Sequence, residues 1–142
     1  MGDHLFKDIE RSGVYTLPTS RWPAAESAAK KAGLCLLNVT IPPRADKDKA
    51  LVQLGADLDF PTWYGANFDA LFDCLTAPDW LPGQGHVIHI KGMARLRTAS
   101  QEDFATLIEV LKAAAEARKE AGHPFWILLD VPAQGIAAFH EA

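Results

Sequence analysis

Three short apolar segments set the strongest limit on how this chain of 142 residues can fold. They occupy residues 34–41, 86–90 and 125–129 and read LCLLNVTI, HVIHI and FWILL. Such nearly continuous apolar runs are typical of strands buried on both faces of a parallel sheet. Helical patterns separate the three segments. This alternation predicts an α/β fold in which the crossover helices cover a mostly parallel sheet.

Helix-start and helix-stop residues support this alternation. Asp46 is a good N-cap for the helix that follows it, and Gly33 and Gly122 stand where glycine ends a helix. Ser100 can begin the longest helix. The predicted helices cover residues 22–32, 47–57, 67–76 and 100–121.

The chain is long enough to bury one core, so we expect a single domain over residues 13–130. Residues 1–12 are charged and aperiodic, and we expect them to form a mobile arm. Residues 131–142 show no periodic pattern and are predicted to be an irregular tail.

Negative charge is concentrated in one part of the chain. Residues 50–90 contain five aspartates and no Lys or Arg. The rest of the chain contains the other 13 of the 18 acidic residues and all 14 basic ones, so the net charge of −4 comes from this segment. The stretch from Phe60 to Trp80 within it also holds six of the 13 aromatic residues. An acidic surface with aromatic side chains favours a cationic protein partner and disfavours direct binding of nucleic acid.

The same stretch contains a short amphipathic helix. Asn67 is a good N-cap, and Gly65 before it suits a backbone position with positive φ. The apolar residues of the helix follow helical spacing and predict one core-facing stripe, made of Phe68, Leu71, Phe72 and Leu75.

Asp69 and Asp73 lie four residues apart in this helix, so their side chains are neighbours on one face. Like charges at this spacing cost a helix a few tenths of a kcal/mol, and the helix dipole disfavours Asp73 near the carboxyl end. The pair is either a solvated acidic face or a functional feature. The residues alone leave both interpretations open.

The run from Pro61 to Thr76 closely resembles the signature P-x-[WY]-[YF]-G-x-N-x-D-A-L-x-D-C-L-T of the barstar family, intracellular inhibitors of the ribonuclease barnase. A looser resemblance extends from Gly33 to Leu129. It implies a small three-stranded parallel sheet packed with helices. Residues 33–130 then form the family core, and residues 13–32 are an extension that could add a helix and an edge strand.

The resemblance also implies a site. In the family, the residue at the position of Asp73 enters the active site of the nuclease and pairs with basic residues there. The residue at the position of Asp69 supports it. Phe68 and Phe72 can show an edge to the partner, and Trp80 stands one residue beyond an aromatic of the family. The implied partner-binding residues are Trp63, Gly65, Asn67, Phe68, Asp69, Phe72, Asp73, Thr76 and Trp80.

The chain departs from the family pattern in its last helix. The family has a glutamate near the end of that helix, and Ala117 stands there when residues are counted back from Gly122. Glu116 and Glu120 flank Ala117 on different helical faces. The cognate nuclease is therefore expected to differ from barnase at the matching patch.

The prediction from these observations is a cytoplasmic immunity protein that inhibits a basic ribonuclease, with no catalysis and no cofactor. One alternative is an acidic interaction module for another cationic protein. A second is a Mg²⁺-dependent enzyme in which Asp69 and Asp73 bind the metal, although no second acidic cluster supplies further ligands.

Cysteine and histidine spacing indicates no metal site. Cys35 and Cys74 are expected to be reduced thiols, with a disulfide between them as the alternative. His86 and His89 are three residues apart in a predicted strand, so they should point to opposite faces of the sheet. The first residues contain no apolar run of signal-peptide length, and no stretch approaches the 18 apolar residues of a membrane helix.

Overall fold

We analysed a computed structural model, which describes residue 6 and residues 8–77 and 85–139. Its centre is a four-stranded sheet in the order β1-β4-β3-β2, and every neighbouring pair is parallel. The strands are β1 (Val14–Thr16), β2 (Cys35–Thr40), β3 (His86–Lys91) and β4 (Phe125–Leu129). The α/β fold with a parallel sheet is thus confirmed.

The sheet has four strands where three were implied for the family core, because the extension adds the edge strand β1. This strand pairs with β4 through Val14 opposite Ile127 and Thr16 opposite Leu129. It is only three residues long. Pro18 follows closely and cannot continue the strand, because proline has no N–H to donate to the strand ladder.

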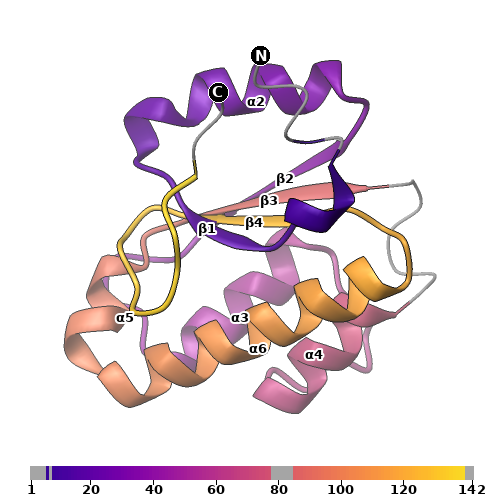
Figure 1. Cartoon of the computed structure of the whole chain (residues 1–142). Coiled ribbons are helices and arrows are strands. Elements are labelled where there is room, and N and C mark those ends of the chain that lie inside the picture. The colour runs from indigo at the N-terminus through magenta and orange to yellow at the C-terminus, as the bar shows by residue number, and fades with distance from the viewer. Residues whose placement is uncertain (1–5, 7, 78–84, 140–142) are drawn as a thin grey trace.

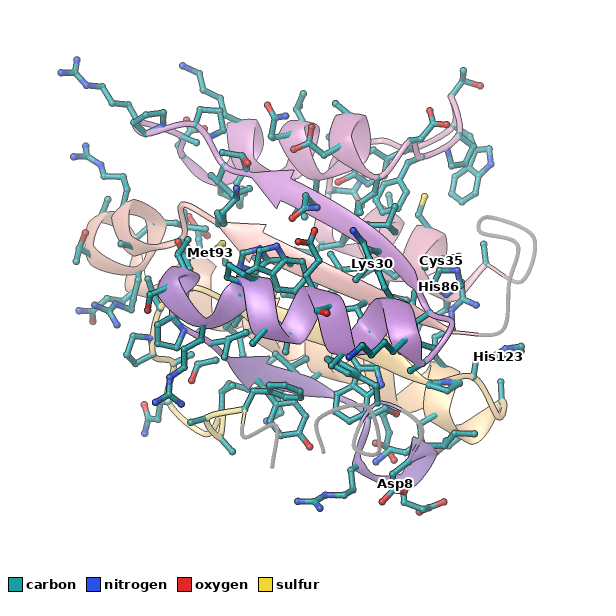
Figure 2. The ribbon with its side chains drawn as sticks, turned by 90° about the horizontal axis from the view of Figure 1, so that it is seen from above. Asp8, Lys30, Cys35, His86, Met93 and His123 are labelled. Carbon is teal, nitrogen blue, oxygen red and sulfur yellow. The ribbon has the colours of Figure 1, made fainter. Side chains whose placement is uncertain are left out.

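Helices cover both faces of the sheet (Figure 1). Of the helices whose bounds the structure describes, α2 (Trp22–Lys31) covers one face, and its position above the strands is also seen in Figure 2. The other face carries α3 (Lys47–Asp57), α4 (Phe68–Thr76), α5 (Ala94–Ala99) and α6 (Gln101–Glu120). Short 3-10 turns occupy Ile9–Arg11 and Thr19–Arg21.

The prediction that residues 34–41 form a strand buried on both faces is wrong. Their strand, β2, lies at an edge of the sheet with β3 as its neighbour, and only Val39 within it is buried. The central strands β3 and β4 show the expected pattern, since nearly all of their residues are buried. An apolar run cannot by itself distinguish an edge strand from a central one, because that depends on strand order.

The segment expected to be a mobile arm packs on the domain where the structure describes it. The Phe6 side chain is fully buried, and its ring lies 5.2 Å from that of Trp126 and 5.1 Å from that of Phe139. Residues 131–139 contain no helix or strand beyond a single bridge between Thr16 and Ala138. Both ends of the described chain therefore share one apolar cluster on the α2 side of the sheet.

His86 and His89 point to opposite faces of β3. The His89 ring stacks on Trp22 of α2 at 4.1 Å, whereas the His86 ring lies 6.2 Å from Phe125. Burial, with a further contribution from Lys91, lowers the pKa of His89. The two rings are thus separated by the sheet and cannot bind one metal ion.

Cys35 and Cys74 are not joined by a disulfide, in agreement with the prediction of reduced thiols. Cys74 is buried and Cys35 is exposed. Cys35 is the register partner of His86, and Figure 2 shows the two side by side. Within the described residues, no helix combines the length and the apolar character needed to cross a membrane.

Candidate functional site: an acidic helix and its supports

The helix α4 begins as its sequence predicts. Asn67 has extended backbone angles, and its Oδ1 accepts a hydrogen bond from the Ala70 N–H at 2.7 Å. This bond satisfies one of the N–H groups that the first turn leaves without a helical partner. Asp69 lies in that first turn, where the helix dipole stabilises its charge.

The two faces of α4 differ sharply. Leu71, Cys74 and Leu75 are buried, and Phe68 and Phe72 are half-buried against the same core. Asp69 and Asp73 are both exposed. Neither carboxylate makes an ion pair with any residue in the described part of the chain. The helix therefore presents two adjacent negative charges that have no partner within this part of the protein.

The turn before α4 differs from the prediction. Gly65 was expected to have positive φ, but the residue with positive φ is Ala66, at 53°. A Cβ atom at Gly65 would lie 3.1 Å from Asn67 Nδ2, a tight contact that a shift of a few tenths of an ångström in the Asn67 side chain would relieve. A side chain at this position would press on the N-cap residue of α4.

The loop that carries Trp63 packs along α3. The Tyr64 hydroxyl donates a hydrogen bond to the Leu51 carbonyl at 2.7 Å, and its ring packs edge-on to Phe60 at 4.8 Å. The ring also lies directly over Gly55, where a Cβ atom would come within 2.5 Å of it. Burial raises the pKa of Tyr64 well above its ordinary value. Trp63, its neighbour, is 58% exposed although it is one of the largest apolar residues.

Asp57 is a structural carboxylate. Its Oδ2 accepts a hydrogen bond from the Thr40 N–H at 3.0 Å, and its Oδ1 accepts one from Gln53 Nε2 at 2.8 Å. Thr40 belongs to the edge strand β2, so Asp57 ties the end of α3 to an N–H group that the sheet leaves without a strand partner. From the sequence, Asp57 was counted among the five aspartates of residues 50–90 that were predicted to form an acidic surface.

We therefore expect Asp57→Ala to lower the free energy of unfolding by about 1 kcal/mol, since it leaves the Thr40 N–H without an acceptor. Urea denaturation measures this loss. Asp57→Asn is the matched control, because its one amide oxygen can accept the Thr40 bond, while the Gln53 amide can turn so that its oxygen accepts from the new NH2 group. It should therefore unfold close to the wild type. Equal stability of the two variants would show that the hydrogen bond contributes nothing.

Arg118 of α6 reaches across to the carboxyl end of α4. Its Nε donates to the Leu75 carbonyl at 2.8 Å, and its Nη2 donates to the Ala77 carbonyl at 3.0 Å. The guanidinium lies over the Phe125 ring, 5.4 Å from its centre, and the side chain is only 6% exposed. Burial lowers the pKa of Arg118.

The helical spacing of α6 contains a signal for Arg118, a residue that was not among the predicted site residues. Leu107, Leu111 and Ala114 form the buried stripe of α6, and Arg118 is the next residue at that helical spacing. A charged residue on a core stripe needs a buried partner. That partner could not be identified from spacing, because it is the main chain of another helix.

The sequence profile of the Barstar family, described as barstar (barnase inhibitor), matches residues 36–130. This span covers more than half of the chain and includes all of α4. The chain belongs to the barstar family. A comparison with curated proteins gave no match.

The helix α6 carries Glu116 and Glu120, which flank Ala117 at the position of the family glutamate. Glu116 and Glu120 are exposed, and Glu116 forms an ion pair with Lys119 at 3.5 Å on the same helix. Ala117 between them is half-buried. Ala117 itself has no carboxylate to make the acidic contact that the barstar resemblance implies at this position.

Three more residues of the site implied by the barstar resemblance are Thr76, Phe68 and Trp80. The Thr76 hydroxyl donates a hydrogen bond to the Phe72 carbonyl at 2.8 Å in the last turn of α4. Lys47 at the start of α3 lies 6.0 Å from the centre of the Phe68 ring, so one basic residue borders this end of the acidic face. Trp80 lies outside the residues that the structure describes, as does Asp79.

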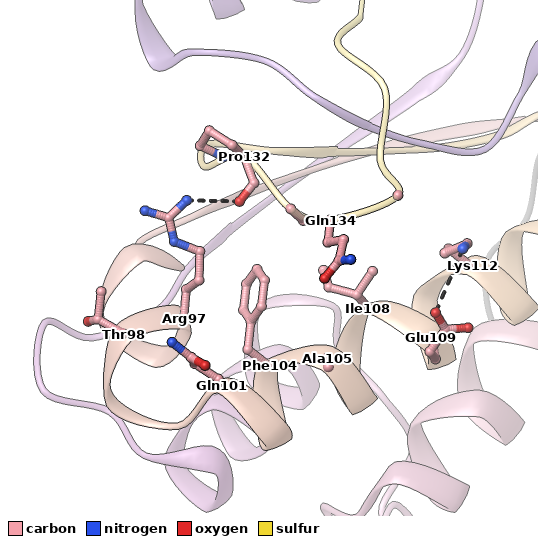
Figure 3. A pocket seen from close by; sticks show the side chains of 12 residues that line it. Arg97, Thr98, Gln101, Phe104, Ala105, Ile108, Glu109, Lys112, Pro132 and Gln134 are labelled. Atoms are coloured by element: carbon pink, nitrogen blue, oxygen red, sulfur yellow. Dashed lines mark hydrogen bonds and ion pairs between the residues drawn. The ribbon is translucent and has the colours of Figure 1, made fainter.

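A cavity of about 840 Å³ lies away from the acidic helix, between α5, α6 and residues 132–135 (Figure 3). Its lining includes Phe104 and Ile108, which are buried in the core, and Arg97, whose Nη1 donates to the Pro132 carbonyl at 2.9 Å. No residue of α4 lines it. Within the described ranges, no group of three or more His, Cys, Asp or Glu side chains could hold a metal ion. Asp69 and Asp73 thus gain no third ligand there.

Proposed function

We propose that this protein inhibits a ribonuclease by placing the acidic face of α4 in the active site of that enzyme. The observation that carries the proposal is the exposed pair Asp69 and Asp73 on a helix that is capped at one end by Asn67 and supported from behind by the core. Membership of a family described as barnase inhibitors points in the same direction.

The chemistry of the proposed partner explains the acidic pair. A ribonuclease must hold the phosphates of RNA, so its active site contains basic side chains. Two carboxylates on a rigid helix can take the place of a phosphate and form charge-assisted hydrogen bonds with those side chains. In this proposal Asp73 enters the site and Asp69 supports it. Trp63, Gly65, Asn67 and Thr76 surround the pair, and Phe68 and Phe72 show their edges to the partner.

The biological role that follows is protection of the cell that makes the nuclease, in the manner of an immunity protein in a toxin–antitoxin pair. The inhibitor would then act in the cytoplasm, where RNA has to be protected. Trp80, which follows α4 in the sequence, is a further proposed contact.

The direct test is a titration of ribonuclease activity with the purified protein. Barnase and any ribonuclease that co-purifies with the protein from its native host are the enzymes to use. Stoichiometric loss of RNA cleavage supports the proposal. Tight binding without loss of cleavage would favour the alternative of an interaction module for another cationic protein. Binding of Mg²⁺ in a calorimetric titration would favour the metal enzyme.

Electrostatic steering should be visible in the association rate. The negative charge of residues 50–90 attracts a basic enzyme, so association should slow at least about tenfold between low and high salt, while dissociation changes little. Stopped-flow kinetics measures both rates. Asp59→Asn is a suitable variant for testing this, since Asp59 has a φ of 55° and asparagine tolerates that conformation. It should reduce the salt dependence, and a salt-independent association rate would refute steering.

A further inference from the structure

The carboxyl end of α4 has almost no capping of its own. Ala77 follows the helix with extended backbone angles, and its N–H reaches the Cys74 carbonyl at 3.3 Å. No glycine stands there to form a left-handed cap, and the last turn contains no basic residue. Asp73 in that turn adds a negative charge where the helix dipole is already negative.

Arg118 supplies what this end of the helix lacks. Its two hydrogen bonds satisfy the carbonyls of Leu75 and Ala77, and its positive charge lies at the negative end of the α4 dipole. Among the described residues Arg118 has no ion-pair partner, so the main chain of α4 is its main polar contact. A buried guanidinium is costly without such contacts.

The geometry of these contacts is specific to arginine. Nε and Nη2 are held in one plane, so their two bonds fix both the position and the direction of the final turn. The stack on Phe125 of β4 fixes the guanidinium in turn, because β4 is a central strand of the sheet. The last turn of α4 is thereby connected to the most buried part of the molecule.

We infer that Arg118 is a positioning residue for partner binding, which holds the last turn of α4 and with it Asp73 in the orientation that the partner recognises. The inference rests on the proposed function. Arg118 is buried and therefore acts through α4 without touching the partner. Replacement of Arg118 should allow the last turn of α4 to fray. Binding would then be weaker, because that turn and Asp73 would have to become ordered in the complex.

The first part of the test needs no partner. Hydrogen exchange of the Leu75 to Ala77 amides is measured in the wild type, in Arg118→Gln and in Ile108→Ala. Ile108 is a buried residue of α6 that lines the cavity on the side away from α4, so its variant reports general destabilisation. We expect at least about tenfold faster exchange of these amides in Arg118→Gln only. Equal exchange in the two variants would overturn the inference, even if no ribonuclease is ever found.

The second part is a double-mutant cycle on ribonuclease binding. Arg118→Gln should weaken binding at least about tenfold in the wild-type background and change it little in an Asp73→Ala background. Arg118→Lys keeps the charge but not the paired bonds, so its effect should be intermediate, and it serves if the glutamine variant fails to fold. An equal loss in both backgrounds would mean that Arg118 does not act through Asp73. Failure of the wild type to bind any ribonuclease would refute the proposed function and leave the exchange result standing.

Discussion

Replacing Asp73 with alanine should abolish most of the inhibition and leave the fold intact. In the proposed complex the carboxylate is buried against several basic groups of the enzyme, and its removal leaves those groups desolvated and unpaired. Such a truncation typically costs about 2–5 kcal/mol, which corresponds to a loss of roughly 30- to 5000-fold in affinity. A titration of ribonuclease activity with each variant measures the loss.

The stability of the free protein is the necessary control. Asp73 is exposed, has no ion pair within the described residues and opposes the helix dipole. Asp73→Ala should therefore unfold within about 1 kcal/mol of the wild type. Asp69→Ala should weaken inhibition by a smaller factor, since its role is supporting. Equal and small effects at Asp69 and Asp73 would show that the acidic surface acts only as a diffuse field.

Replacing Gly55 with alanine should have the second large effect, through the loop that carries Trp63. The new methyl group would lie 2.5 Å from the Tyr64 ring, a distance that no side-chain contact tolerates. The ring would have to move, and its hydrogen bond to the Leu51 carbonyl would be lost. We expect a loss of about 2 kcal/mol in the free energy of unfolding and weaker binding of the nuclease. Urea denaturation and inhibition assays measure the two effects.

A double mutant tests whether the clash with Tyr64 is the cause. Removal of the ring in Tyr64→Ala makes room for the methyl group at residue 55. Gly55→Ala should then add little to the cost of Tyr64→Ala, so the two effects should be far from additive. Full additivity would locate the damage within α3 itself.

Local patterns in the sequence were sufficient to predict the parts of the site that depend on near neighbours. The apolar stripe of α4 and its cap at Asn67 involve residues within one or two turns, and both are found as predicted. The same holds for Asp46, whose carboxylate accepts a hydrogen bond from the Lys49 N–H at the start of α3.

The supports of the site could not be predicted because they join residues that are distant in sequence. Asp57 bonds to Thr40, and Arg118 bonds to Leu75 and Ala77. Each contact depends on which elements become neighbours in space. The edge position of β2 and the positive φ of Ala66 belong to the same class, since strand order and loop packing decide them.

The contact between the Phe6 and Phe139 rings has a practical consequence for experiments on this protein. Both residues lie on the α2 side of the sheet, whereas α4 lies on the opposite side (Figure 1). A linker attached before Phe6 or after Phe139 would be separated from Asp73 by the whole thickness of the sheet. The protein could therefore be tethered to a sensor surface through either end with its acidic helix facing the solution.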